Sequence, residues 1–345
     1  METGPLVPEQ DFDQELETHI DKLVEGLAPS DARLAREIVM TAVKMAREQV
    51  TRLDRKIINS AMKELRYAFR VFSPYRGVRK VTMFGSARTK KGDPTYRAAL
   101  AFSRAIADRG WMVITGAGPG IMEAGSEGAG GERSFGVNIL LPFEADPNPY
   151  IAGDPKLINF KYFFTRKLMF VKEADAFVLL PGGFGTLDEV LELLTLVQTG
   201  KSPLRPILML DHPDGRYWER FVAYLRESVL ANGYISERDL SLFRHVSSPE
   251  DAVIEIENFY RVFHSQRIVG RQLVLRLKRM PSDELLATLS EEFAHIMNGE
   301  IKKVEVSKVE IGDDDQVDLP RIAFEFDWAY VGDLRRLIDK LNSAS

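Results

Sequence analysis

The sequence predicts an α/β protein: a doubly wound, Rossmann-like parallel sheet with a helical N-terminal region and a small C-terminal α+β module. From Val78 onward, short β-rich runs alternate with helical stretches. Most of these runs are apolar without strict alternation, as is typical of parallel strands covered on both faces. Repeated strand–helix–strand units give right-handed crossovers. We expect a helical region at 1–77, the domain of the parallel sheet at 78–265 and the α+β module at 266–345.

The N-terminal region has only helical periodicity. Apolar residues recur at helical spacing from Leu16 to Leu23, from Ala32 to Val43 and from Ile57 to Phe69. Pro29-Ser30-Asp31 predicts a turn and an N-cap between the first two stretches. No motif occurs here, so we interpret this region as a packing or oligomerisation appendage.

The sheet domain contains five predicted strands. They are Val81–Phe84, Trp111–Thr115, Phe135–Leu140, Ala176–Leu180 and Pro206–Leu210. The helix over 94–109 begins at Pro94 after an Asp93 cap.

The C-terminal module has a different pattern. We predict strands at Leu273–Leu277, Lys302–Glu310 and Arg321–Phe326, and helices at Ser282–Met297 and Val331–Leu341. This β-α-β-β-α order resembles ligand-sensing domains of the ACT type in topology. Because the segment carries none of the candidate catalytic residues, we expect it to regulate the reaction.

Composition excludes several classes of function. The 345 residues include no cysteine, so disulfides and thiolate catalysis are excluded. No apolar run is long enough for a membrane span, and no signal peptide is recognised, so we expect a cytoplasmic protein. The net charge of −5 disfavours nucleic-acid binding. The five histidines are scattered without metal-ligand spacing, so we expect no metal.

The strongest motif is Pro181-Gly182-Gly183-Phe184-Gly185-Thr186-Leu187-Asp188-Glu189, which follows an apolar strand and opens a helix. Ligands of such sheets bind beyond the carboxyl ends of the strands. Gly182, Gly183 and Gly185 let the backbone approach an anion, and the helix N-terminus offers N–H donors to a phosphate. The hydroxyl of Thr186 adds a donor, and Glu189, one turn in, would lie beside the sugar.

A structural alternative is that Thr186 and Glu189 form a capping box. In that case Thr186 caps the helix, Glu189 reaches back to close the box, and the glycines only make a tight turn. Capping does not require three glycines in four positions, which favours the anion site.

A second loop, Gly116 to Glu123, also follows a strand and opens a helix. Its glycines Gly118 and Gly120 resemble a dinucleotide fingerprint, but Ile121 stands where the third glycine belongs, and no acidic residue ends the next strand. A nucleotide-dependent oxidoreductase is therefore disfavoured.

Two cations, Arg166 and Lys167, fall in the first turn of a helix that runs to Lys172. Cations there oppose the helix dipole, and an anionic substrate or a carboxylate such as Glu189 would justify them. Gly85-Ser86 follows the first strand and supplies a hydroxyl at the same edge of the sheet.

These segments together resemble the LONELY GUY family, long mislabelled as lysine decarboxylases. The signature P-G-G-x-G-T-x-x-E occurs from Pro181 to Glu189, and the family's Arg-Lys pair matches Arg166 and Lys167. The run from Gly118 to Ala124 and the pair Gly85-Ser86 resemble the family's other two glycine loops. The resemblance covers residues 78–200.

The resemblance implies hydrolysis of the N-glycosidic bond of a nucleoside 5′-monophosphate, AMP or a cytokinin nucleotide, to free base and ribose 5-phosphate. Glu189 would stabilise the oxocarbenium-like transition state and activate water, and Arg166 would hold phosphate or ribose. Gly183, Gly185 and Thr186 would bind the phosphate, with Glu123 near the ribose or base. The resemblance implies no cofactor, and we expect a homodimer or higher homo-oligomer.

Two other classes remain. Proteins of similar fold carry molybdenum cofactor without catalysis, although the presence of both Arg166 and Glu189 speaks against a carrier. A single-strand DNA-binding protein of the DNA-processing type would need a basic, aromatic-lined groove, which the negative net charge disfavours. Nothing marks a Schiff-base lysine or a pyridoxal phosphate site.

Overall fold

The computed structural model describes residues 9–140, 146–313 and 315–344. The chain divides into two compact units, residues 1–65 and 66–345. The first unit holds α1 (Glu9–Leu23), α2 (Pro29–Arg47) and the first part of α3 (Arg52–Phe72). These three helices confirm the periodicity of the N-terminal sequence.

The second unit contains a seven-stranded parallel sheet in the order β4-β3-β2-β1-β5-β6-β7. Its strands are β1 (Lys80–Phe84), β2 (Met112–Thr115), β3 (Ser134–Ile139), β4 (Leu157–Phe160), β5 (Ala176–Leu179), β6 (Ile207–Leu210) and β7 (Arg244–Val246). Every residue of β1, β2, β5 and β6 is buried. The core of this sheet is therefore covered on both faces, as the apolar runs predicted.

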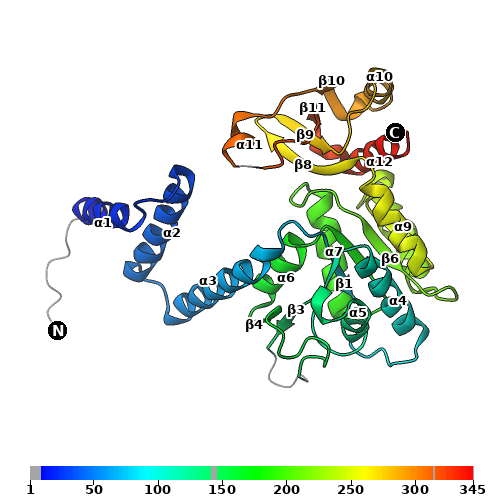
Figure 1. The fold of residues 1–345 in the computed structure, drawn as a ribbon, viewed down its shortest axis with the longest axis horizontal. Helices are drawn as coiled ribbons and strands as arrows, with labels where there is room; N and C mark the ends of the chain where they lie inside the picture. Colours follow the sequence, from blue (N-terminus) through cyan, green and yellow to red (C-terminus); the bar gives the residue numbers. More distant parts are fainter. Residues whose placement is uncertain (1–8, 141–145, 314, 345) are drawn as a thin grey trace. The chain divides into compact units, whose positions relative to one another are not determined.

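Helices follow β1, β2, β4, β5, β6 and β7 along the chain (Figure 1). They are α4 (Pro94–Asp108), α5 (Ile121–Ala129), α6 (Phe163–Lys172), α7 (Phe184–Gln198), α8 (Tyr217–Tyr224) and α9 (Pro249–Phe259). Right-handed crossovers are the rule for such parallel connections. From β1 the chain adds strands first on one side, up to β4, and then on the other side, from β5 to β7. With crossovers of one hand, α4 and α5 therefore lie on one face of the sheet and α6, α7 and α8 on the other. α9 packs against α4. The predicted doubly wound fold is confirmed.

The predicted strand positions agree with β1, β2, β3, β5 and β6 to within one residue at each end, and Asp93 accepts a hydrogen bond from Thr95 N at the start of α4. The sequence did not reveal β4 and β7, the two edge strands. β7 has only three residues, Arg244, His245 and Val246, none of them buried. Strands were predicted from runs of apolar residues. An edge strand such as β7 has a neighbouring strand on one side only and is less buried, so its sequence contains no such run.

The C-terminal part contains a four-stranded antiparallel sheet in the order β10-β11-β9-β8. Its strands are β8 (Phe263–Val269), β9 (Gln272–Leu277), β10 (Met297–Lys303) and β11 (Arg321–Phe326), and its helices are α10 (Asp283–Glu292), α11 (Lys308–Gly312) and α12 (Val331–Ser343). The predicted strand at Lys302–Glu310 is wrong, because the strand ends at Lys303 and residues 308–312 are helical. The predicted helix at Ser282–Met297 is too long, since β10 begins at Met297. The element order is therefore not the β-α-β-β-α order behind the ACT resemblance.

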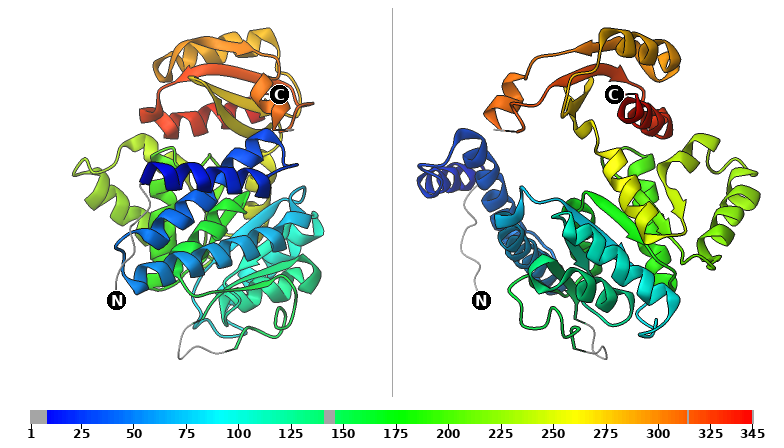
Figure 2. Two further views of the ribbon diagram at one scale, coloured as in Figure 1. Left: turned by 90° about the vertical axis from the view of Figure 1, so that its left-hand side faces the viewer. Right: turned by 45° about the vertical axis from the view of Figure 1, so that its right-hand side comes forward.

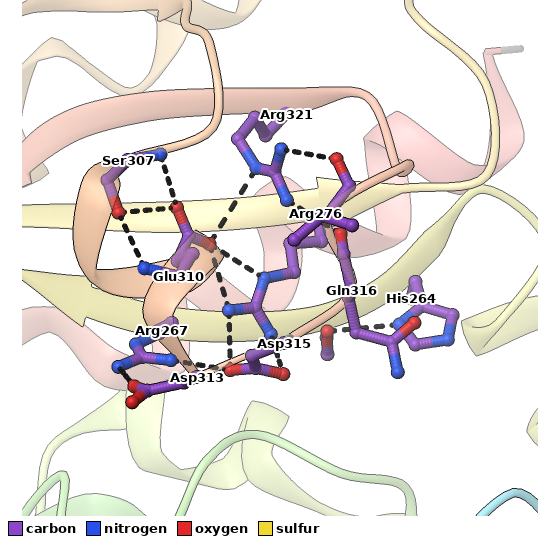
Figure 3. A network of polar contacts seen from close by, with 11 residues as sticks. His264, Arg267, Arg276, Ser307, Glu310, Asp313, Asp315, Gln316 and Arg321 are labelled. Carbon is purple, nitrogen blue, oxygen red and sulfur yellow. Dashed lines mark hydrogen bonds and ion pairs between the residues drawn. The ribbon is translucent and has the colours of Figure 1, made fainter. Parts of the chain in front are cut away.

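A buried ionic network fixes α11 to this sheet (Figure 3). The guanidinium of Arg276 on β9 donates to both Glu310 (2.9 Å) and Asp315 (2.8 Å). The side chains of Arg276 and Glu310 are 4% and 1% exposed. Both charges of this pair have lost their hydration, so each is stable in the interior only while the other is present. The pair therefore favours one position of α11 on the sheet.

The last helix, α12, packs on β8 and on α9, so it lies between the four-stranded sheet and the parallel sheet (Figure 2). Asn342 accepts from the N–H groups of Val262 and Phe263 and donates to the carbonyl of Phe259. Leu337, Ile338 and Leu341 are fully buried. α12 is thus an integral part of the second unit. Within the described ranges, no helix has the length and apolar character needed to cross a membrane.

Candidate active site at the strand ends

Three loops meet where the direction of the sheet reverses, at the carboxyl ends of β1, β2 and β5. The N–H of Ser86, after β1, donates to the carbonyl of Pro181, after β5 (3.1 Å). The carbonyl of Ser86 accepts from the N–H of Ile121 at the start of α5 (3.0 Å). Ser86 therefore joins the three glycine loops that the sequence placed at one edge, in the position where doubly wound folds bind ligands.

Close approach explains the glycine at 120. Gly120 has a φ of +69°, and a Cβ there would lie 2.4 Å from the carbonyl oxygen of Ser86. A side chain at this position would break the contact between the first and second loops. Gly120 thus acts on the geometry of the site, whereas the sequence assigned it to the substrate together with Gly118.

The third loop leads into α7 with its N-terminus open. The N-cap is Gly183, without a side-chain cap, and the first helical bond runs from Leu187 N to Gly183 O (3.1 Å). The N–H groups of Phe184, Gly185 and Thr186 therefore have no acceptor within the helix. Gly183 and Gly185 are exposed, and a Cβ at either position would meet no atom within 4 Å. The backbone at Gly183 and Gly185 is therefore open to an anion.

The capping-box alternative is wrong. Thr186 is the third residue of α7, so it does not stand at the N-cap where a box would need it. Its buried side chain instead packs against Gly182, where a Cβ would lie 2.1 Å from the Thr186 hydroxyl oxygen. This contact requires glycine at position 182.

Arg166 on α6 extends toward the ends of β2 and β3. Its Nε donates to the carbonyl of Val137 (2.8 Å), and its guanidinium carbon lies 5.1 Å from the ring centroid of Phe170. A Cβ on Gly116 would lie 2.4 Å from a terminal nitrogen of Arg166. The cation is thus held against the loop that follows β2.

Lys167, the next residue, faces the carboxylates of α7. Its ammonium lies 2.7 Å from Asp188, 2.5 Å from Glu192 and 3.7 Å from Glu189. Although burial lowers the pKa of Lys167, hydrogen bonds to Asp188 and Glu192 outweigh this and raise it. Lys167 is therefore a protonated partner of these carboxylates, and its predicted contact with substrate stays a prediction.

Glu189 is the buried carboxylate of this group, with a side chain 12% exposed. Burial raises the pKa of Glu189 to about 7, against the lowering effect of Lys167 and Arg166. A carboxyl group with a pKa near neutrality can exchange a proton at physiological pH, which suits a general acid or base.

Glu123 lies in the first turn of α5, at the second loop. It forms an ion pair with Lys91 (2.9 Å), which also lies 3.8 Å from Glu127. Lys91 comes from the segment after the first loop. The sequence singled out Glu123 but missed this partner, because an isolated lysine in a loop carries no signal.

A fourth strand end, that of β6, adds residues that the sequence did not single out. The hydroxyl of Tyr217 donates to the carbonyl of Gly182 (2.7 Å). Asp211, fully buried directly after β6, accepts from Trp218 N (2.9 Å) and contacts His245 Nε2 (3.1 Å). Their position just after a predicted strand was the available signal.

A cavity of about 870 Å³ occurs elsewhere in the second unit, lined by residues of η4 (Glu237–Leu242), α10 and α12. None of its lining residues belongs to the glycine loops. Its cations are paired with carboxylates, for example Arg244 with Asp339 (2.8 Å). We place the candidate active site at the strand ends because the uncapped N-terminus of α7 and Glu189, the carboxyl group with the raised pKa, lie there. Among the described residues, no group of three or more His, Asp or Glu side chains could hold a metal ion.

Comparison with known proteins shows which family the chain resembles. Residues 120–256 match the family model described as "Possible lysine decarboxylase". The chain is 29% identical over 181 residues to a cytokinin riboside 5′-monophosphate phosphoribohydrolase LOG of Oryza sativa subsp. japonica, covering 51% of this chain and 71% of the relative. It is 29% identical over 209 residues to another such phosphoribohydrolase of Arabidopsis thaliana, covering 58% and 91%. These matches confirm the family resemblance that the sequence predicted.

A solved structure also resembles this chain. It is the molybdenum cofactor carrier protein of Chlamydomonas reinhardtii, at 19% identity and a TM-score of 0.37, covering 52% of this chain and 96% of the carrier.

Proposed function

From the premise that this chain is a relative of the LONELY GUY family, we propose that it hydrolyses the N-glycosidic bond of a nucleoside 5′-monophosphate. The products are the free base and ribose 5-phosphate. One observation carries the proposal: α7 combines accessible N–H donors at its N-terminus with a buried carboxyl group, Glu189, one turn further on.

The N-terminus of α7 suits the 5′-phosphate. We expect the N–H groups of Gly183, Gly185 and Thr186 to donate to its oxygens, and the helix dipole favours the negative charge there. Gly183 and Gly185 are exposed, so a phosphate can reach them without a clash with side chains of their own.

The reaction breaks the bond between C1′ of the ribose and the base nitrogen. The oxygen of water bonds to C1′ and the departing base nitrogen takes up a proton, so that water is divided between the two products. The ribose gains oxocarbenium character on the way, which an ionised carboxylate stabilises. We assign this role to Glu189, which in its ionised form also accepts a proton from the attacking water. Arg166 holds the phosphate or the ribose, and Ser86, Gly118 and Glu123 complete the side of the site toward the base.

The substrate that we propose is AMP or a cytokinin riboside monophosphate. The lysine decarboxylase label of the matching family model finds no support at Lys167. That ammonium is held by three carboxylates, which keeps it protonated, whereas Schiff-base formation requires the neutral amine.

We propose further that the protein acts in the cytoplasm as a homodimer or higher homo-oligomer. The first unit exposes apolar side chains at Leu34 (50%), Ile38 (54%) and Leu53 (63%), which an assembly would cover. Light scattering on the full chain and on a variant with Leu34, Ile38 and Leu53 changed to serine tests this, since a monomeric wild-type chain would contradict it.

The proposed function is tested by comparing AMP with adenosine. A site built around phosphate donors rejects a substrate without that group by a large factor, about 10⁴ or more in kcat/KM. Equal kcat/KM for the two would contradict the phosphate site. A carrier protein, the other class considered, would bind AMP without releasing ribose 5-phosphate.

A further inference from the structure

We propose that Tyr217 is a positioning residue that fixes the direction of the Gly183 N–H group and thereby prepares the phosphate site. This inference rests on the proposed function, because it assigns a role in binding the 5′-phosphate. It concerns a residue outside the glycine signature, 35 positions away from Gly182 along the chain.

The argument begins with the peptide between Gly182 and Gly183. In a trans peptide, the C=O and N–H groups point in opposite directions. The Tyr217 hydroxyl donates to the Gly182 carbonyl at 2.7 Å, and this bond holds the oxygen on the side of α8. The N–H of Gly183 must therefore point away from Tyr217.

This constraint matters because both residues are glycines. A Cβ at Gly183 would meet nothing within 4 Å, so packing limits this peptide only on the Gly182 side, where Thr186 is in contact. Glycine also has the widest choice of backbone conformation. The hydrogen bond from Tyr217, which lies on another element, fixes the orientation of this peptide from its carbonyl side.

The position of Tyr217 is itself fixed by contacts of the residues around it. Trp218, the next residue, is fully buried, and its N–H donates to the carboxylate of Asp211 at 2.9 Å. The rings of Tyr217 and Trp218 meet edge to face at 4.8 Å. Gly215 lies in the tight turn before α8, where a Cβ would lie 3.0 Å from the His212 carbonyl oxygen.

The same oxygen of Asp211, Oδ2, also contacts the last strand of the parallel sheet. The Asp211 carboxylate contacts His245 Nε2 at 3.1 Å, and His245 belongs to β7. The start of α8 is thus anchored to β6 and β7 through Asp211. Tyr217, at the start of this helix, in turn holds the loop after β5 by its hydrogen bond to Gly182. The phosphate loop is therefore supported by the adjacent half of the sheet.

The test is Tyr217→Phe, which removes only the hydroxyl, with Tyr224→Phe on the same helix as the matched control. Tyr224 is 56% exposed, so its hydroxyl is not needed for packing. A hydrogen bond of this kind corresponds to a change of up to about tenfold in an equilibrium constant. We expect Tyr217→Phe to raise KM for AMP and Kd for ribose 5-phosphate about tenfold, with kcat within about twofold and Kd for adenosine unchanged.

A second measurement reads the positioning without catalysis. In protein labelled with ¹⁵N, inorganic phosphate should shift the Gly183 amide resonance in the wild type and in Tyr224→Phe. Tyr217→Phe should require about tenfold more phosphate for the same shift. If the wild type does not hydrolyse AMP but this difference is found, the proposed function fails and the positioning role stands.

Two outcomes overturn the positioning role. One is an unchanged response to phosphate and ribose 5-phosphate in Tyr217→Phe alongside normal AMP hydrolysis by the wild type. The other is an equal weakening of adenosine and ribose 5-phosphate binding, which would show that Tyr217 supports the fold of the whole site.

Discussion

The ammonium of Lys167 lies 3.7 Å from the carboxylate of Glu189, yet the pKa of Glu189 is raised to about 7. Burial of Glu189 disfavours its charge, and the nearby cations Lys167 and Arg166 offset only part of this effect. The carboxyl group of Glu189 thus feels two cations and is still able to bind a proton near neutral pH. The pH dependence of the reaction should report this balance.

We expect kcat/KM for AMP to rise with pH through about 7. The proposed role of Glu189 requires the ionised form, which dominates above its pKa. The second ionisation of the substrate phosphate lies near pH 6, so a ³¹P titration of AMP separates the two effects. A profile with no ionisation near 7, or one that falls there, would contradict a role for the Glu189 carboxylate as base.

Lys167→Gln should move this rising limb to higher pH by on the order of one unit, because it removes a cation that lowers the pKa of Glu189. Lys172→Gln is the control on the same helix, since the partner of Lys172 is Glu173. If Lys167→Gln raises KM for AMP without moving the limb, Lys167 binds the phosphate, as the sequence predicted.

Arg166→Ala should lower kcat/KM for AMP by about 100-fold, the scale of a lost positioning contact. Its cost in stability should be about 1 kcal/mol, because one hydrogen bond to the Val137 carbonyl disappears. Arg133→Ala is the control, since Arg133 likewise donates to a backbone carbonyl, that of Gly110 (2.9 Å). Unchanged kinetics in a stable Arg166→Ala variant would remove Arg166 from the site.

Glu310→Gln should destabilise the second unit by about 3–5 kcal/mol at pH 7. The substitution removes the negative charge that faces the buried guanidinium of Arg276. Hydrogen bonds from Ser307 and Arg276 overcome the effect of burial and lower the pKa of Glu310. The contribution is therefore present above its ordinary pKa of 4.5 and is lost as the pH falls through the lowered value.

Urea unfolding at pH 7 and at pH 3 checks this, with the exposed Glu305→Gln as control. The difference in free energy of unfolding between wild type and Glu310→Gln should shrink at the lower pH. An equal difference at both values would show that the charge of Glu310 is not its source.

Two segments with the same local pattern show what the sequence could and could not predict. Ser307-x-x-Glu310 forms a capping box, and α11 begins there. The alternation of valines with polar residues in this stretch instead favoured a strand. Thr186-x-x-Glu189 forms no such box, because the N-cap of α7 is already Gly183. The choice depends on the surroundings of each segment, which one stretch of sequence does not contain.

The central strands and the glycine loops followed from the sequence because buried parallel strands are apolar throughout and their ends meet at one edge. The partners of the site residues did not follow. Lys167 meets Glu192 across two helices, and Tyr217 meets Gly182 across two strand ends. Such pairs depend on packing between elements, and no local motif encodes them.

The C-terminal module differs from the sequence prediction in how it packs on the rest of the second unit. The sequence predicts that it regulates the reaction from a separate domain, and a regulatory role stays a prediction. α12 contributes Leu341 and Asn342 to the packing around α9, however. Removal of the residues after Ser265 would therefore expose part of the core of the second unit, so effector experiments require the full chain.

The release of ribose 5-phosphate from AMP by wild type and Glu189→Gln tests the central claim most directly. Glu189→Gln should retain AMP binding and lower kcat by about two decades or more, the scale of a lost acid–base group. It should be no less stable than the wild type at pH 8, since a carboxyl with a raised pKa loses its contribution to stability as the pH rises through about 7. Wild-type protein that binds AMP without releasing ribose 5-phosphate, or Glu189→Gln with wild-type kcat, would contradict the account.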